Sequence, residues 1–219
     1  MDYQILIARY PVVVRAYGKL LDETKGDKEK YGEFFLKQIK SSLHGIAHWV
    51  RVGIYGLTIA EHLFKNGRAA RHWLSNHEPF EQAVLYACFF HDTCRDGEGL
   101  ELEHGRRAEK LWRTFAEERK MNERILTAVS HALLFHVAHR AVDPFACDVT
   151  ICLCNADRLD RVRLGEKTLA KRMYDDGVWQ DLAQHSERLL REVNMARIEE
   201  DFGDILHAFE KKNRVALYL

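Results

Sequence analysis

Apolar residues recur at helical spacing along most of this chain, and few residues interrupt them. Only three prolines occur in 219 residues, while Ala, Leu, Glu, Lys and Arg, which favour helices, are plentiful. The pattern predicts an all-α fold built as a helical bundle. Its expected helices lie over 34–64 (long or broken), 80–90, 101–119, 122–138, 147–163, 180–195 and 200–211.

Local composition sharpens this prediction. The segment FEQAVLYACFF at 80–90 is apolar on nearly every face, which predicts a central, buried helix running directly into His91 and Asp92. Residues 3–14 carry many β-branched side chains and are compatible with a short strand or an irregular helix. Points of close helix packing are expected at Gly45, Gly53 and Gly56. Loops are indicated at 22–32, 96–99 and 142–144.

Length and composition are those of an ordinary globular protein, with 47% hydrophobic and 30% charged residues. We expect a single domain over 1–219. No run of 18 apolar residues occurs, so no membrane span is expected. The start, MDYQILIARYPVVV, lacks the basic region and cleavage site of a signal peptide, and a cytoplasmic location is therefore expected.

Charge excludes one broad class of function. Lys and Arg together number 33, and so do Asp and Glu. A protein that mainly coats nucleic acid needs a strongly basic face, so this balance argues against that task. The five cysteines show no C-x-x-C spacing and are interpreted as reduced thiols that pack in the interior.

Histidine is the unusual component, because ten of the twelve lie between His44 and His139. Two ionisable residues, His91 and Asp92, follow an apolar helix, where desolvation is costly unless a partner compensates. A divalent cation would compensate, since it prefers neutral imidazole and carboxylate ligands. A capped helix end with a buried histidine is the ordinary interpretation of an isolated dipeptide.

The surrounding motifs change that interpretation. Upstream, HGIAHWVRV places His44 and His48 on one helical face. Downstream, NADRLDRVRLG carries Asp157 on an expected helix. Between them, EHGRRAEKL carries His104, and SHALLFH carries His131 and His136.

These segments resemble the HD-domain superfamily of metal-dependent phosphohydrolases, whose signature is a His, a His-Asp pair and a distal Asp. The similarity is to small bacterial HD-domain proteins with the patterns HG-x-x-HW-x-RV, HD-x-x-R-x-x-EG, HG-x-RA and ADRLD. The matching segments here are HGIAHWVRV, HDTCRDGEG, HGRRAEK and ADRLD. The resemblance covers about 41–165, flanked by an N-terminal segment (1–40) and a helical C-terminal extension (166–219).

The resemblance implies a metal site with one or two divalent ions, of Mn, Fe, Ni, Co, Mg or Zn. The matching ligands are His48, His91, Asp92 and Asp157. A second ion would add His104 and His136 while Asp92 bridges. His131 stays open as an alternative to His136, which we prefer for its distance to Asp157.

Further candidates surround these ligands. Arginine suits bidentate phosphate contact, and each of four arginines is close in sequence to a proposed ligand. We expect substrate contacts from Arg51, Arg95, Arg106, Arg158 and His44. Catalytic roles are expected for Asp92, Arg95 and Glu98, the last as a general base, although a solvated loop carboxylate is an equal interpretation of Glu98.

The expected function is hydrolysis of a small phosphorylated molecule, such as a nucleotide, by metal-activated water. The alternatives are a dinuclear phosphodiesterase, a di-iron oxygenase of the same fold, and a nucleotide-binding module without activity. The apolar end VALYL at 215–219 could pack on the domain or form a homodimer contact.

Overall fold

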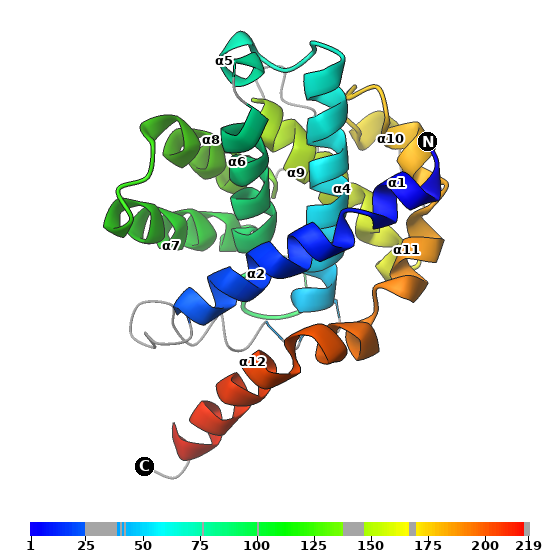
Figure 1. The fold of residues 1–219 in the computed structure, drawn as a ribbon. Helices are drawn as coiled ribbons and strands as arrows, with labels where there is room; N and C mark the ends of the chain where they lie inside the picture. The colour runs from blue at the N-terminus through cyan, green and yellow to red at the C-terminus, as the bar shows by residue number, and fades with distance from the viewer. Residues whose placement is uncertain are drawn as a thin grey trace.

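The computed structural model describes residues 1–24, 39, 41, 43–75, 77–99, 101–137, 147–166 and 170–216, without the side chains of residues 72, 74, 205 and 208–216. These residues form helices joined by turns, with no β-strand among them, which confirms the all-α prediction (Figure 1). The α-helices are α1 (Tyr3–Ile7), α2 (Tyr10–Thr24), α4 (Ile46–Lys65), α5 (Arg71–Leu74), α6 (His77–Phe90), α7 (His104–Glu118), α8 (Glu123–Phe135), α9 (Asp148–Leu159), α10 (Trp179–Ala183), α11 (Ser186–Glu192) and α12 (Met195–Ala216). Short 3-10 helices, η1 (Asp160–Leu164) and η2 (Ala170–Arg172), follow α9.

Helix α4 lies at the centre of the bundle, where it packs against α2, α6 and α9 (Figure 1). All its side chains from Ile46 to Ala60 are buried. Two glycines allow this close packing. A Cβ at Gly53 would lie 2.6 Å from the Tyr17 hydroxyl, and one at Gly56 would lie 2.7 Å from Cys88 Sγ. Both helices that cross α4 here, α2 and α6, therefore approach it more closely than a larger residue would permit.

The remaining helices enclose this centre. Helix α6 contacts α8 and α9, and α7 packs on α8. Helix α6 is buried over its C-terminal half, ending in Phe89 and Phe90, as its apolar pattern predicted. Because α4, α6, α8 and α9 are held by apolar packing, the polar side chains at their ends have fixed positions.

The two ends of the chain pack against each other and onto the bundle. Helix α12 contacts α2 and α4, and then extends away from the bundle toward the C-terminus (Figure 1). Tyr3 donates a hydrogen bond to Glu192 Oε2 (2.7 Å), and Tyr10 donates one to Asp201. Residues near the N-terminus and residues of the C-terminal extension are thus tied to one another by polar contacts.

Several element boundaries differ from the prediction. Residues 3–14, which allowed a strand, belong to α1 and α2. The expected helix over 180–195 is two short helices, because the chain turns at Gln184 and His185. The expected helix over 147–163 changes to 3-10 geometry at Asp160. Residues 22–24 of the expected loop at 22–32 form the end of α2, and the helix expected over 34–64 begins at Ile46, after a turn at 43–45. The expected loop at 142–144, residues 25–32 and residues 34–38 lie outside the described residues. None of the described helices is long and apolar enough to cross a membrane.

Candidate metal centre

Five helix ends bring the proposed ligands together. His48 lies in the first turn of α4, and His104 is the first residue of α7. His91 and Asp92 follow α6 in a turn. His136 ends α8, and Asp157 lies in the last turn of α9.

Asp92 lies between two groups of imidazoles. The first, here called the α4/α9 group, consists of His48, His91 and Asp157 with Asp92 Oδ2. The second, called the α7/α8 group, consists of His104 and His136 with Asp92 Oδ1. The two oxygens of one carboxylate thus face different groups.

Distances within the α4/α9 group are short. His48 Nε2 lies 3.1 Å from His91 Nε2 and 3.4 Å from both Asp92 Oδ2 and Asp157 Oδ1. Donors at about 2.1 Å from a tetrahedral cation are about 3.4 Å apart. The described side chains therefore have the spacing of ligands around one ion.

The α7/α8 group has the same character. His104 Nε2 lies 3.0 Å from His136 Nε2, and these nitrogens are 3.3 and 4.0 Å from Asp92 Oδ1. A second cation position beside the first is compatible with this geometry, with the Asp92 carboxylate shared between them.

Hydrogen bonds made by Nδ1 determine the tautomer of three of these imidazoles, and their Nε2 atoms face the other proposed ligands. Nδ1 contacts a backbone carbonyl in three cases: Cys88 for His91 (2.8 Å), Glu101 for His104 (2.5 Å) and Leu133 for His136 (2.8 Å). A carbonyl only accepts, so Nδ1 carries the proton. In the neutral rings Nε2 then presents a lone pair, and the facing Nε2 atoms repel unless a cation lies between them. The donor set fits a metal ion.

Charge states at neutral pH suit this role. Burial lowers the pKa of His91 to about 4, and burial with the neighbouring His104 and His91 lowers the pKa of His136 well below 6.5. Burial alone would raise the pKa of Asp92, but the surrounding imidazoles, chiefly His91, hold it well below its usual value. Burial would also raise the pKa of Asp157, but the charge of Arg163, and after it that of His48, lowers this pKa. At neutral pH the site thus offers the neutral imidazoles of His91 and His136 and the ionised carboxylates of Asp92 and Asp157.

A cavity of about 170 Å³ opens beside the ligands. Its lining includes Asp92, His104, His136 and Asp157, together with Arg95 and Glu98. Arg95 is buried and donates to the carbonyl of Gly99 (2.5 Å). Its Nη1 lies 3.6 Å from Asp92 Oδ1. Glu98 accepts a hydrogen bond from Ser41 Oγ (2.6 Å), and its half-exposed carboxylate lies at the rim.

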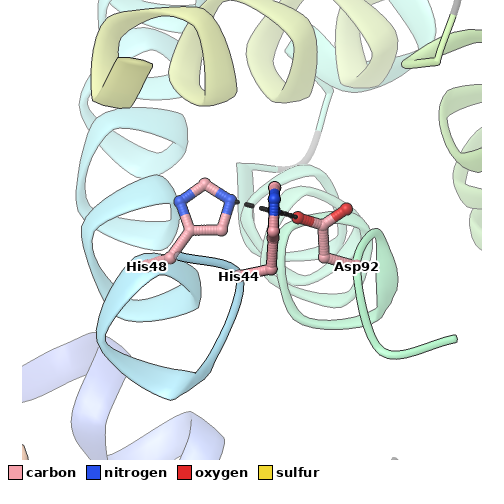
Figure 2. A group of neighbouring side chains, drawn as sticks. All are labelled: His44, His48 and Asp92. Carbon is pink, nitrogen blue, oxygen red and sulfur yellow. Dashed lines mark hydrogen bonds and ion pairs between the residues drawn. The ribbon is translucent and has the colours of Figure 1, made fainter. Parts of the chain in front are cut away.

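His44 forms a hydrogen bond with Asp92, and its ring also lies edge-on to the ring of His48. Its Nδ1 donates to Asp92 Oδ2 over 2.8 Å, and its Nε2 lies 3.8 Å from Glu98 Oε2. Figure 2 shows His48 in the first turn of α4 and His44 just before that helix, both close to Asp92, which follows α6. His44 therefore orients the shared carboxylate, and with His48 and Asp92 it also forms a further set of closely spaced ligand atoms.

The structure separates the two histidines that the sequence left as alternatives. His136 lies in the α7/α8 group, whereas His131 contacts Thr150 Oγ1 (2.7 Å) and stacks on Phe135. The five-residue spacing puts them on different sides of α8, and only His136 reaches the other ligands.

Three of the four arginines expected to contact substrate lie away from the cavity lining. Arg51 is buried behind His48, where it donates to both oxygens of Asp160 (2.7 and 3.0 Å) and to the Val193 carbonyl. Arg106 is exposed, near Glu103. Arg158 donates to the Arg172 carbonyl and lies over Tyr174. Nearness in sequence to a ligand did not place these guanidinium groups beside it.

Two important residues were missed, and both follow Asp157 in the motif NADRLDRVR. Asp160 is fully buried and contacts His48 Nδ1 at 2.8 Å. Burial alone would raise its pKa, but Arg51, and then the hydrogen bond from His48, lower that pKa to about 2. Arg163 lines the cavity, with Nη2 3.7 Å from Asp157 Oδ1. The spacing of three residues between Asp157 and Asp160 was the available signal, because it puts both on one helical face.

Comparisons with protein-family models, with curated proteins and with solved structures find no match to this chain. Its function is therefore argued from the geometry of the site and the motifs that form it.

Proposed function

We propose that this chain is a metal-dependent phosphohydrolase of the HD-domain type, which hydrolyses a small phosphate ester such as a nucleotide. One observation carries the proposal: imidazole Nε2 atoms converge in two groups on the two oxygens of a single buried carboxylate, Asp92. The order of the ligands along the chain, a His, a His-Asp pair, two more His and a distal Asp, agrees with the HD signature.

The side chains around the cavity suit phosphate ester hydrolysis. A divalent cation held by these ligands would supply a water nucleophile at neutral pH and neutralise charge on phosphate oxygens. Arg95, held by the carbonyls of Gly97 and Gly99, would donate to a phosphate oxygen. Glu98, with one oxygen held by Ser41, would accept the proton of the attacking water. His44 keeps Asp92 in place.

The first test is metal content and hydrolysis by the purified full chain. We expect up to two divalent ions per chain, and turnover of nucleotides or generic phosphate monoesters or diesters with Mn²⁺, Ni²⁺, Co²⁺, Mg²⁺ or Zn²⁺. Asp92→Ala should lose both metal and turnover, while Glu117→Gln, an exposed change on α7, is the control. Absence of turnover with any metal would reject the proposal.

The same screen separates the alternatives. Faster turnover of diesters would identify a phosphodiesterase. Oxygen consumption by the iron-loaded protein, without hydrolysis, would identify a di-iron oxygenase. Nucleotide binding by metal-loaded protein without any turnover would leave a binding module.

A further inference from the structure

We propose that Arg163 and Arg95 form a two-ended anion site, which selects a terminal phosphate monoester, a dianion, over a phosphodiester. This inference rests on the proposed function, because it names the substrate class of the same site. It begins with Arg163, which lines the cavity but belongs to neither ligand group.

The guanidinium group of Arg163 is fixed and buried. Its Nε donates to the Leu43 carbonyl (2.7 Å), and its side chain is 4% exposed. The carboxylates of Asp157 and Asp160 lie 3.7 Å from Nη2 and Nη1, beyond hydrogen-bond distance. Nη1 is buried and has no hydrogen-bond partner among the described residues. A buried donor without a partner is rare. Because the side chain of Arg163 lines the cavity, an anion bound there would lie beside this guanidinium group.

The two arginines lie at opposite ends of the ligand cluster. Arg95 Nη1 is 3.4 Å from His104 Nε2, in the α7/α8 group. Arg163 contacts Asp157, in the α4/α9 group. A phosphate bound across both metal positions would therefore meet a guanidinium at each end, in a geometry that arginine suits better than lysine.

The number of phosphate oxygens then favours a monoester. A monoester has three non-bridging oxygens and carries two negative charges near neutral pH, whereas a diester has two such oxygens and one charge. Two cation positions and two guanidinium groups offer more partners than a diester can use. The cavity, about 170 Å³, is also below the 300 Å³ or so typical of drug-sized ligands, and a diester must place substituents on both sides of its phosphorus.

The test compares p-nitrophenyl phosphate with bis(p-nitrophenyl) phosphate, which share a leaving group. We expect Arg163→Gln to lower kcat/KM for the monoester by about thirtyfold and for the diester by less than about threefold. Arg163→Lys keeps the charge beside Asp157 and Asp160, and should still lose about tenfold on the monoester. Arg113→Gln is the control, since Arg113 is an exposed arginine on α7 that lies outside the cavity lining and is paired with Glu109. It should change either rate by less than about threefold.

A second measurement keeps this inference separate from the proposed function. Inorganic phosphate should bind the metal-loaded wild-type chain about tenfold more tightly than the metal-loaded Arg163 variants, by calorimetry at equal metal content. If no ester is hydrolysed but this difference holds, the anion site stands and the proposed hydrolase fails. Equal losses on monoester and diester, or unchanged phosphate binding in both Arg163 variants, would overturn the inference. Should Arg163→Gln fail to fold, Arg163→Lys decides both measurements.

Discussion

The α4/α9 and α7/α8 groups differ in what supports their imidazoles. In the α4/α9 group, His48 is backed by the carboxylate of Asp160, which Arg51 holds in turn through two hydrogen bonds. In the α7/α8 group, His104 and His136 are backed by the backbone carbonyls of Glu101 and Leu133. An imidazole that is hydrogen-bonded to a carboxylate is a more basic metal ligand than one that is hydrogen-bonded to a backbone carbonyl.

The charge around the two groups differs in the same direction. Each group has a neighbouring arginine, Arg163 for the α4/α9 group and Arg95 for the α7/α8 group. Among the described residues, however, the α4/α9 group contains Asp157 and shares Asp92, whereas the α7/α8 group has its share of Asp92 alone. We therefore infer that a cation binds the α4/α9 group first and more tightly, and that an ion at the α7/α8 group, with one shared carboxylate, exchanges more readily.

The largest effect is expected where the two groups meet. Asp92→Ala removes the carboxylate that both groups share, so both metal positions should be lost and hydrolysis should fall by on the order of a thousandfold. Metal analysis after gel filtration and turnover with excess Mn²⁺ check this. Retention of full metal content would contradict the shared role of Asp92.

The second largest effect is expected for Asp160, whose carboxylate is hydrogen-bonded to His48 of the α4/α9 group. Asp160→Asn should lower metal affinity at this group by about 10- to 100-fold, since His48 loses its charged partner. It also leaves Arg51 buried without a counter-charge, which costs about 3–5 kcal/mol of folding stability. Metal titration and urea unfolding measure the two effects separately. The added substitution Arg51→Met should recover part of the stability without restoring metal affinity.

Removal of one ligand from either group should show which group binds its metal ion more tightly. In His136→Ala the α7/α8 group loses an imidazole, and the chain should retain one ion where the wild type retains two. In His48→Ala the stronger group is damaged, so the remaining ion should bind more weakly than in His136→Ala. Stoichiometry and affinity by calorimetry test this order, and the reverse order would refute the comparison.

Acid should destabilise the metal-free chain through its buried imidazoles. The pKa of His91 is about 4 in the fold and about 6.5 in an unfolded chain, so the unfolded state binds more protons between these values. Stability therefore falls as pH is lowered from about 6.5 to about 4. Urea unfolding in the presence of a chelator should show this slope, and His91→Gln should reduce it. A slope that is unchanged in the variant would assign the effect to other groups.

The smallest effect is expected outside both groups. His131→Ala should leave metal content and turnover unchanged, because His131 bonds Thr150 rather than a proposed ligand. Its loss should cost about 1 kcal/mol of stability from that hydrogen bond. Thermal unfolding and metal analysis distinguish it from His136→Ala, five residues away on the same segment.

Much of the fold was predictable from local pattern. The apolar run at 80–90 became α6, and the glycines at 53 and 56 became close crossings, because burial and side-chain volume act locally along a helix. Residues 3–14 were ambiguous because β-branched side chains suit strands and buried helix faces alike. They form two helices here, from which Leu6, Tyr10 and Val13 pack into the core.

The sequence by itself determined which residue types could hold a cation, since the histidines and aspartates of the motifs stand out without any coordinates. Only the tertiary structure decided the orientation of their neighbours. Arg51 faces Asp160 and Arg163 faces the cavity, although Arg51, and not Arg163, was among the four arginines expected to contact substrate. A side chain's direction depends on which helix packs opposite it, and that partner can be more than a hundred residues away in the chain, as Asp160 is from His48.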